Sequence, residues 1–565
     1  MISVYYDGEC PFCTQYVRMV RLQRTSEVRL IDLREDEALR ARFEAEGYDL
    51  DGGMVVDDRG ARYSGDKAVS YMAALSTPSD AFNRLNRWIF SQGALAAALY
   101  PVMRAGRWVA LFLLNRPLIS DAEDTSRFRR EIFATFFAFF SIFHVFNYAF
   151  EYRIFPPSWD TLALGVTALA LLFRPSSARL LFALMLISTV STVLQAPVQS
   201  NHTIVRAAAL LGYWMSFFTA MARNDHFDKV FERFAPAGCA ALLIMYFYGV
   251  FHKINWDFLN PVTSCATTLW REMPWPLSAL QGPFIDYSAI YGTFVVEGLI
   301  AGALLFRATR HLGIAAGIAF HLLLSLSGYA MYISFTTLSI ALHTCFLSEG
   351  AARSILSAPI VQAVRTKLEE PIYKASVLAL CLGLVSLAHS GSYTLTTLAT
   401  FPFILPFCWA VLRYGGERSE LNETPKRHAL PAIGMIVGAL FLANGAMPYL
   451  GLKTAQSINM FANLRLEAGE SNHLVFSGDH RPFGYLDDIV TLPKSGTHRV
   501  YYDVLVWAKN NPEATVTFER NGTLYEEQNA ASLKQDIDRI LFPAWVNKWF
   551  HFQPVELASP EPCGV

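Results

Sequence analysis

The sequence predicts a mixed fold: a small α/β domain at the N-terminus, a polytopic α-helical membrane domain of about eleven spans, and a β-rich soluble domain at the C-terminus. Short apolar strands alternate with helical segments in residues 1–78, long apolar stretches recur within 127–452, and residues 453–565 return to a soluble composition. Of the 565 residues, 53% are hydrophobic and only 17% are charged, with a mean hydropathy of +0.27. Soluble proteins rarely combine these values, so we expect a membrane protein of several domains.

The N-terminal domain is predicted element by element. ISVYY and VRLIDL have the apolar pattern of strands, and CPFCTQYVRMVRL and EDEALRARFEAEG that of helices, the second closed by Gly47. GMVVDDRGARYS indicates a hairpin that turns at 58–60, and DKAVSYMAAL a last helix with Asp66 as its N-cap. Strand–helix–strand–helix–hairpin–helix is the order of a thioredoxin-like fold. No signal peptide is recognisable, so we expect this domain in the cytosol.

Residues 79–126 are predicted to form an amphipathic helical linker. Trp88, Phe90, Trp108 and Phe112 recur among spaced arginines in this segment. Large apolar side chains interleaved with cationic ones are typical of a helix that lies in the membrane interface. We therefore expect the linker on the membrane surface.

Residues 127–452 contain eleven apolar stretches of about the length of a membrane span. They lie near 131–150, 157–174, 178–198, 204–222, 234–255, 288–306, 312–331, 333–348, 372–390, 395–413 and 429–452. Lysine and arginine cluster before the first stretch and then in every second loop, whereas the alternate loops are nearly free of them. Because basic loops stay in the cytosol, the pattern predicts a multi-pass protein of the cell membrane with a cytosolic N-terminus and an external C-terminus.

The C-terminal residues 453–565 are expected to form an external β-rich domain. LRLEAGE, HLVFSG, IVTLP, RVYYDVLVW and ATVTFE have the pattern of strands, and ASLKQDIDRILFPAWVNKWF that of a closing amphipathic helix. Apart from Cys10 and Cys13, the eight cysteines are scattered singly along the chain, so no disulfide framework is predicted. The net charge of −1 provides no broad positive field, and we expect no nucleic-acid partner.

The pair Cys10 and Cys13 in DGECPFC is the first candidate site. A thiol at the start of a helix feels unpaired N–H groups and the positive end of the helix dipole, which lower its pKa. A second cysteine one turn later can resolve a mixed disulfide, so Cys10 is the candidate attacking thiol and Cys13 the resolving one. A zinc knuckle needs a second Cys or His pair nearby, which the sequence lacks, so no metal is predicted. The remaining alternative is a reduced pair with a structural role only.

A family resemblance sharpens this choice. YYDGECPFC, the later DDRGARYSGDKAV and WIFSQGALAAALYPVMRAGRWVALFLLNRP resemble the DCC family of thioredoxin-like thiol–disulfide oxidoreductases over about the first 118 residues. The resemblance implies a redox role for Cys10 and Cys13 with a cytosolic thiol partner. Thioredoxins place a cis-proline opposite their CxxC, whereas here no proline occurs between Pro11 and Pro78, and Gly53-Met54 takes the corresponding position. We therefore do not expect a partner disulfide to dock in the usual thioredoxin manner.

Ionisable residues inside the predicted spans are the second candidate site. His144, Glu297, His321 and His343 fall well inside apolar stretches, where charge is costly and usually functional. Lys253 lies at the outer end of the fifth stretch, in YFYGVFHKINWDFLN. A snorkelling interfacial lysine and packed, hydrogen-bonded histidines are the structural alternatives.

A second resemblance concerns these residues. YFYGVFHKINWDFL, VVEGLI, AFHLLLSLSGYAMYISF and MFANLRLEAGESNHLVF resemble the vitamin K-dependent γ-carboxylase-like membrane family, also called the horizontally transferred transmembrane domain, over about 127–480. In the carboxylase a lysine deprotonates a quinol, and the resemblance places Lys253 on that lysine and Glu297 and His321 on embedded polar positions. His252 stands where the carboxylase has a second lysine, and the C-terminal part is shorter, so peptide carboxylation is not implied. The cofactor that this resemblance suggests is a reduced quinone of the vitamin K type.

Three hypotheses follow for the membrane domain. The first is an oxidoreductase or carboxylase-like enzyme that acts on a quinol-type or lipid-soluble substrate, with Lys253, His252, Glu297 and His321 as candidate catalytic residues. The second is a proton-coupled transporter or channel in which Glu297, His321 and His343 line a path, although no repeat symmetry of the kind found in transporters is visible. The third is a metalloenzyme, which ranks last because these histidines lack the i, i+3 or i, i+4 spacing of helical ligands. The bilayer is the expected environment in each case.

Overall fold

The structure is a computed structural model, and it forms two compact units. The first is Met1–Ser126 with Trp214–Glu232, and the second is Arg127–Tyr213 with Arg233–Val565. The residues that the structure describes are 1–19, 27–77, 81–119, 124–147, 158–196, 201–328, 332–389, 393–416, 432–478, 481–557 and 563. The ends of several predicted segments, including 20–22 of the first helix and 148–150 of the first apolar stretch, lie outside these ranges.

The first unit contains a four-stranded sheet of the predicted element order. Its elements are β1 (Ile2–Tyr6), α1 (Pro11–Met19), β2 (Val28–Asp32), α2 (Glu37–Ala45), β3 (Val55–Asp58), β4 (Ala61–Ser64) and α3 (Asp66–Leu75). The strand order is β2-β1-β3-β4, with β1 and β2 parallel and the other pairs antiparallel. Val4, Val56 and Met72 are buried in its core. N-terminal residues thus form a small α/β domain, as predicted.

Two local details of this domain bear on the predictions. The hairpin turns at Arg59 and Gly60, whose φ values of 55° and 93° are those of a two-residue turn that matches strand twist. The prediction of Asp66 as an N-cap is wrong, because Asp66 is the first helical residue and Gly65, at φ 62°, occupies the cap. Only a residue without a Cβ adopts that conformation at low cost, so glycine takes the cap and the acidic residue the first turn, where it favours the helix dipole.

The predicted linker helix is two helices, α4 (Ala81–Phe90) and α5 (Gly93–Leu114). The chain is not helical at Ser91 and Gln92. α5 is long and apolar enough to cross a membrane by length and composition, which the prediction of a surface helix did not anticipate. Its Arg107, Trp108 and Leu111 are nevertheless buried within the first unit. Asn115 caps the C-terminus of α5, and its φ of 58° lies in the left-handed region.

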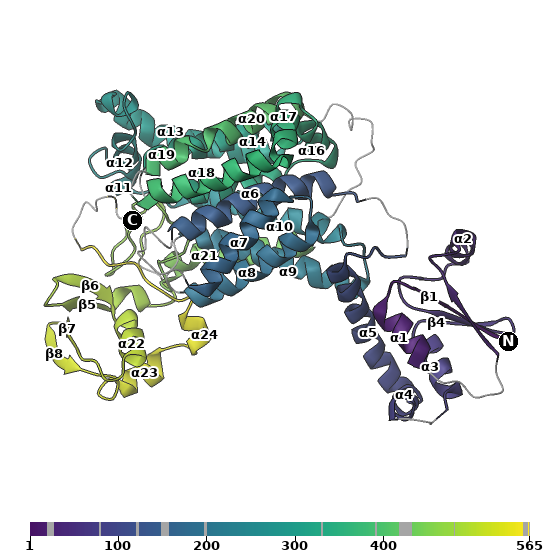
Figure 1. The fold of residues 1–565 in the computed structure, drawn as a ribbon. Coiled ribbons are helices and arrows are strands. Elements are labelled where there is room, and N and C mark those ends of the chain that lie inside the picture. The colour runs from purple at the N-terminus through teal and green to yellow at the C-terminus, as the bar shows by residue number, and fades with distance from the viewer. Residues whose placement is uncertain are drawn as a thin grey trace. The chain divides into compact units, whose positions relative to one another are not determined.

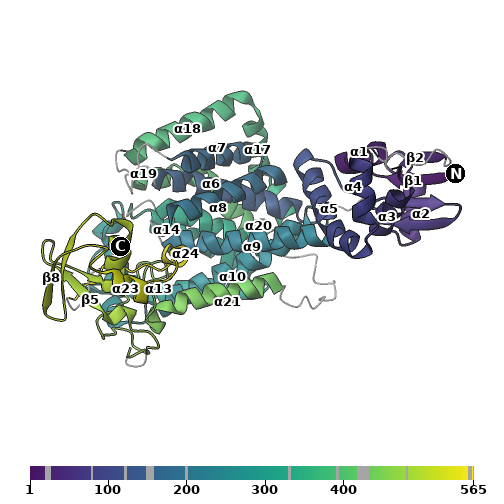
Figure 2. The same ribbon diagram turned by 90° about the horizontal axis from the view of Figure 1, so that it is seen from below.

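The body of the second unit is helical (Figures 1 and 2). Its long helices are α6 (Arg127–Phe146), α7 (Trp159–Phe173), α8 (Ala178–Gln195), α9 (Asn201–Arg223), α10 (Lys229–Phe251), α13 (Pro283–Leu305), α14 (Arg310–Ser325), α15 (Tyr332–Thr344), α18 (Pro371–His389), α20 (Phe401–Tyr414) and α21 (Ala432–Ala446). The end of α9 from Trp214 and the start of α10 up to Glu232 belong to the first unit. Shorter helices between them are α11 (Trp256–Leu259), α12 (Cys265–Arg271), α16 (Glu349–Leu356), α17 (Pro359–Glu369) and α19 (Tyr393–Leu398). α6 packs against both α7 and α15.

Six helices of the described residues are long and apolar enough to cross a membrane. They are α5, α8, α9 from His202, α10, α13 and the segment Ala432–Leu450 that contains α21. Four of the other predicted stretches contain shorter apolar helices, and the stretch at 395–413 is divided between α19 and α20. The stretch at 131–150 begins within α6, whose N-terminal turns contain arginines.

The C-terminal region contains a second sheet with the order β6-β5-β7-β8. Its strands are β5 (Ile489–Leu492), β6 (Thr497–Val500), β7 (Val516–Arg520) and β8 (Thr523–Gln528), accompanied by α22 (Tyr501–Asn510), α23 (Lys534–Ile540) and α24 (Ala544–Asn547). IVTLP and ATVTFE form strands as predicted. The prediction of one strand over RVYYDVLVW is wrong, because β6 ends at Val500 and α22 follows. LRLEAGE and HLVFSG form no strand, and the closing helix is interrupted before Pro543.

One disulfide corrects the expectation from cysteine spacing. Cys265, at the start of α12, is bonded to Cys563 near the C-terminus, 298 residues later. Isolated cysteines that far apart give no local signal of pairing, so spacing alone could not predict this bond. Among the described residues, the free cysteines are Cys10, Cys13, Cys239, Cys345 and Cys408.

Candidate functional sites

Cys10 and Cys13 lie at the junction between β1 and α1. Pro11 is the first residue of α1, and the Cys13 N–H donates a 3.1 Å hydrogen bond to the Cys10 Sγ. The hydrogen bond from the Cys13 thiol, the Cys13 N–H and the charge of Arg107 together lower the pKa of Cys10 to about 7, against the opposing effect of burial. The pKa of Cys13 is raised well above its ordinary value, because its thiol donates to Cys10 and is largely desolvated. Cys10 is therefore the thiol that ionises first.

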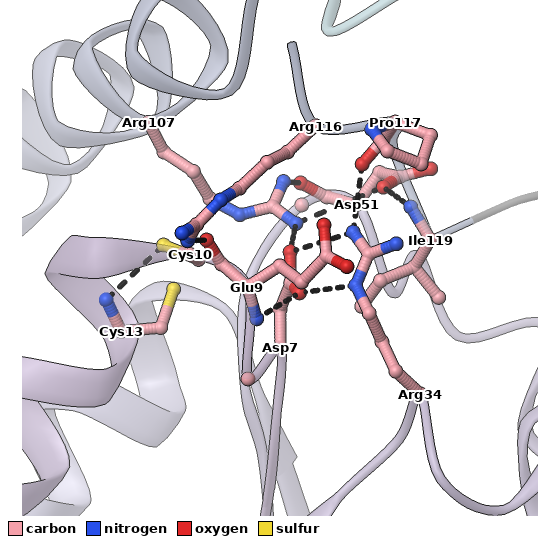
Figure 3. Close-up of polar contacts among 12 residues, drawn as sticks. Asp7, Glu9, Cys10, Cys13, Arg34, Asp51, Arg107, Arg116, Pro117 and Ile119 are labelled. Carbon is pink, nitrogen blue, oxygen red and sulfur yellow. Dashed lines mark hydrogen bonds and ion pairs between the residues drawn. The ribbon is translucent and has the colours of Figure 1, made fainter. Parts of the chain in front are cut away.

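A cluster of opposite charges lies beside this pair (Figure 3). The Asp7 carboxylate accepts hydrogen bonds of 2.6 Å from Arg34 Nε and from Arg107 Nη2. Arg107 also donates to the backbone carbonyl of Asp51. Burial acts to raise the pKa of Asp7, but the hydrogen bonds and charges of Arg34 and Arg107 outweigh it and lower the pKa. The cluster thus fixes a positive charge, that of Arg107, which acts on both thiols.

The residues that follow α5 cover one side of the site. Arg116 donates to the backbone carbonyl of Glu9, the residue that precedes Cys10 (Figure 3). Arg34 Nη2 donates to the Pro117 carbonyl at 2.7 Å, and the Ile119 N–H donates to Asp51 Oδ1 at 2.7 Å. We call residues 115–119 the covering segment. Cys10 is 0% exposed, whereas Cys13 is partly exposed, so the more acidic thiol is the less accessible one.

α5 also contacts the loop at Gly53-Met54, which the sequence predicts at the position of the thioredoxin cis-proline. The Tyr100 hydroxyl donates to the Gly52 carbonyl, and a Cβ on Gly53 would lie 2.0 Å from that hydroxyl oxygen. Gly53 is therefore needed for the close approach of Tyr100. This loop and α5 are held together by side chains, which differs from an open docking edge.

The comparison with known families agrees with this geometry. Residues 4–111 match the family of DCC1-like thiol-disulfide oxidoreductases. The match begins in β1, includes both cysteines, Asp7 and Arg107, and ends in α5. No curated protein and no solved structure matches the chain. We refer to residues 4–111 as the DCC1-like domain.

The second candidate site lies beyond the DCC1-like domain, in the helical body. α10 ends at Phe251, and Lys253 follows it with its Nζ 2.8 Å from Oε1 of Glu297 on α13. Both residues are 7% exposed. A snorkelling lysine would extend its ammonium group towards water, so this buried ion pair does not fit the interfacial alternative.

A small cavity of about 60 Å³ borders this ion pair. Its polar lining is formed by His202, Tyr246, Lys253, Glu297, His321 and Tyr332, and its apolar lining includes Val205, Met245 and Phe335. Of the four candidate catalytic residues predicted for this domain, the structure thus brings together Lys253, Glu297 and His321. The fourth, His252, does not line the cavity. The space accommodates several water-sized molecules.

Two buried polar atoms at this cavity have no hydrogen-bond partner among the described residues: Oε2 of Glu297 and Nδ1 of His321. Gly249 allows Glu297 its position, because a Cβ there would lie 2.8 Å from Oε2. Buried polar atoms are normally paired, so unpaired ones at a cavity indicate a ligand or water. Among the described residues, no group of three or more His, Cys, Asp or Glu side chains could hold a metal ion.

His252 and His144 lie apart from this arrangement. His252 Nδ1 lies 2.7 Å from the Tyr449 hydroxyl and Nε2 lies 3.0 Å from the Ser457 carbonyl, so both ring nitrogens are used for packing. His144 Nε2 lies 3.3 Å from Gln195 Oε1. Neither His252 nor His144 lines the cavity. Three residues that were not predicted from the sequence do line it: Tyr246, His202 and Tyr332. Tyr246 precedes Lys253 by seven residues, two helical turns, which is the only local signal for it.

Proposed function

We propose that the DCC1-like domain is a cytosolic thiol–disulfide oxidoreductase of thioredoxin-like fold in which Cys10 attacks and Cys13 resolves. The observation that carries the proposal is the hydrogen bond from the Cys13 N–H to the Cys10 Sγ in a site where the pKa of Cys10 is about 7. The Cys10 thiolate attacks one sulfur of a partner disulfide and releases the other as a thiolate. Cys13 then loses its proton, attacks the Cys10 sulfur and releases the second partner thiolate, so the partner is reduced and the pair is oxidised.

This reaction requires access to a covered sulfur. Because Cys10 is buried and the covering segment is tied down by Arg34, Arg116 and Asp51, a partner has to displace that segment or dock beside Cys13. The contacts between α5 and the Gly53 loop argue against docking in the usual thioredoxin manner. The partner is a cytosolic thiol or disulfide of unassigned identity.

Trapping of a mixed disulfide tests this proposal on the full chain. With oxidised glutathione as the probe, a Cys13→Ser variant is expected to accumulate one glutathione on Cys10, because no resolving thiol is present. A Cys10→Ser variant is the matched control and is expected to accumulate far less on Cys13, whose pKa is raised. Equal labelling of the two variants, read by mass spectrometry, would return the pair to a structural role.

A second function is proposed for the helical body, because the buried Lys253–Glu297 pair borders a cavity with an unpaired carboxylate oxygen. We infer a membrane-embedded acid–base enzyme, carboxylase-like and acting on a quinol-type or lipid-soluble substrate, with Lys253 as general base. A salt-bridged lysine becomes a base when it passes its proton to the paired carboxylate, which leaves a neutral amine and a neutral acid. Glu297 and His321 are then the groups that exchange protons with it.

The alternative is a proton-coupled transporter in which the same groups line a path. Oxygen consumption by purified protein supplied with a reduced quinone, compared with pH-driven proton flux in proteoliposomes, separates the two functions. The proposed topology puts Cys10 in the cytosol and Lys253 near the external face, so electrons from the pair would need a mobile carrier to reach the cavity. The Cys265–Cys563 disulfide supports the external placement of the segment after Lys253, since disulfides persist in oxidising compartments.

A further inference from the structure

Tyr246 joins two histidines from different helices. Its hydroxyl lies 3.0 Å from Nε2 of His321 on α14 and 3.1 Å from Nε2 of His343 on α15. All three side chains are buried. His321 and Tyr246 line the cavity, whereas His343 does not line it, and its Nδ1 lies 2.7 Å from the Ser339 carbonyl.

These contacts determine where each proton lies when both imidazoles are neutral, the form that burial without an acidic partner favours. A carbonyl only accepts, so Nδ1 of His343 carries a proton and Nε2 of His343 is an acceptor. The Tyr246 hydroxyl therefore donates its one proton to His343, and its oxygen accepts the Nε2 proton of His321. Nδ1 of His321 is left as a bare lone pair, and it is the atom that has no partner.

Two glycines make this arrangement possible. A Cβ on Gly317, one helical turn before His321 on α14, would lie 2.1 Å from Nε2 of His343, the atom that accepts from Tyr246. The absence of a Cβ at Gly249 on α10 likewise leaves room for Oε2 of Glu297. Glycine inside a helix costs about 1 kcal/mol relative to alanine, so it needs a packing reason, and here that reason is the polar chain.

We propose that His321, Tyr246 and His343 form a proton relay that carries a proton out of the cavity and onto His343. The inference rests on the acid–base function proposed for Lys253, because that reaction leaves one substrate proton on the Lys253–Glu297 pair. Nδ1 of His321 accepts this proton from protonated Glu297, directly or through a water in the cavity. The Nε2 proton of His321 passes to the Tyr246 oxygen, and the Tyr246 proton passes to Nε2 of His343.

The proton count is conserved at each step. One bond to hydrogen breaks at Glu297 and one forms at Nδ1 of His321, while the positive charge arises on His343, beyond the cavity. The Lys253–Glu297 pair returns to its ionised form. The titratable groups that border the cavity besides the relay are His202 from α9, Lys253 after α10, Glu297 from α13 and Tyr332 from α15.

Nitrogen-15 NMR of histidine-labelled full-length protein tests the relay without any substrate or activity assay. In the resting protein His321 is expected to be protonated at Nε2 only and His343 at Nδ1 only. On acidification the relay predicts a tautomer exchange: His321 becomes protonated at Nδ1 only as His343 becomes doubly protonated. Signals are assigned by loss in His321→Gln and His343→Gln, or by their response to Tyr246→Phe if those variants fail to fold.

Tyr246→Phe keeps the ring and removes the connecting hydroxyl. In this variant His321 is expected to become doubly protonated on acidification, with no tautomer exchange, while His311 on the same helix behaves as in the wild type. A resting His321 protonated at Nδ1, or an exchange that survives Tyr246→Phe, would overturn the relay. Because these spectra report proton positions alone, loss of the Lys253 reaction would leave their outcome unchanged, and the two proposals fail separately.

Discussion

The Arg107 guanidinium lies 2.6 Å from the Asp7 carboxylate, 100 residues earlier in the chain, and both side chains are buried. The two charges act on Cys10 in opposite directions: Arg107 lowers its pKa and Asp7 raises it. α5 thus contributes the cation of the thiol site, although the cysteines belong to the β1–α1 junction. The DCC1-like domain is complete only with this helix.

Opposite substitutions in this ion pair test its electrostatic role. Arg107→Gln is expected to raise the pKa of Cys10 and to slow its alkylation by iodoacetamide at pH 7 severalfold, because the thiolate loses a nearby positive charge. Asp7→Asn is expected to lower the pKa of Cys10 and to leave more thiolate at pH 6. If the substitutions only loosened the fold, the pKa of Cys10 would shift in the same direction in both variants. That outcome would contradict the electrostatic explanation.

Arg116→Ala tests whether the covering segment limits access. The variant is expected to raise the alkylation rate of Cys10 at pH 9, where the thiolate is fully formed, by several fold. The pH midpoint should move little, since the hydrogen bond from the Cys13 thiol is the largest contribution that lowers the pKa of Cys10. Arg104→Ala is the control, because it removes an arginine of α5, outside the covering segment, that donates to the Ala222 carbonyl. A shifted midpoint with an unchanged plateau would assign Arg116 an electrostatic role instead.

Lys253→Arg separates a base from a structural cation. Arginine keeps the ion pair with Glu297 but cannot give up its proton, so activity of the helical body with a reduced quinone is expected to be lost while folding is retained. Lys253→Met is expected to lower the free energy of unfolding by about 3–5 kcal/mol, because Glu297 is left buried and unpaired. Lys453→Arg, at another buried lysine outside the cavity, controls for the size of the substitution. An active Lys253→Arg protein would rule out the lysine base.

Membrane sidedness is tested with two exposed serines. Ser495, in the C-terminal region, and Ser354, on α16, are both exposed. A cysteine at Ser495 is expected to react with a membrane-impermeant maleimide in intact cells, and one at Ser354 only after lysis. Protection of the Ser495 site until lysis would reverse the proposed topology. The Cys265–Cys563 pair is expected to resist alkylation until a reductant is added.

The DCC1-like domain was predictable because its signals are local. Alternating strands, the turn at Arg59-Gly60 and the CxxC before Pro11 each depend on a few neighbouring residues. RVYYDVLVW was misassigned since its aromatic and β-branched residues favour a strand, whereas Tyr501, Val504, Leu505 and Ala508 recur with a helical period and face the core of this region. β8 was missed because most of TLYEEQ is exposed and polar, as suits an edge strand.

The candidate sites were less predictable, because tertiary packing assembles them. The sequence indicated Lys253, Glu297 and His321 singly, but only the packing of α10, α13 and α14 places them at one cavity. No sequence pattern indicated that Arg107 contacts the thiol site, since an arginine in an amphipathic segment is usually exposed to solvent. The Cys265–Cys563 disulfide and the Tyr246 contacts join residues far apart in the chain, and no periodicity reports such contacts.

The pH dependence of Cys10 alkylation in the full-length, reduced protein tests the redox role most directly. The rate follows the thiolate fraction, so a pKa of about 7 predicts a rise that is half complete near pH 7. The Cys13→Ser variant removes the thiol that donates to Cys10, and its midpoint is expected at higher pH. A wild-type midpoint near 8.5, about the pKa of an ordinary cysteine, would contradict both the activation of Cys10 and the proposed oxidoreductase function.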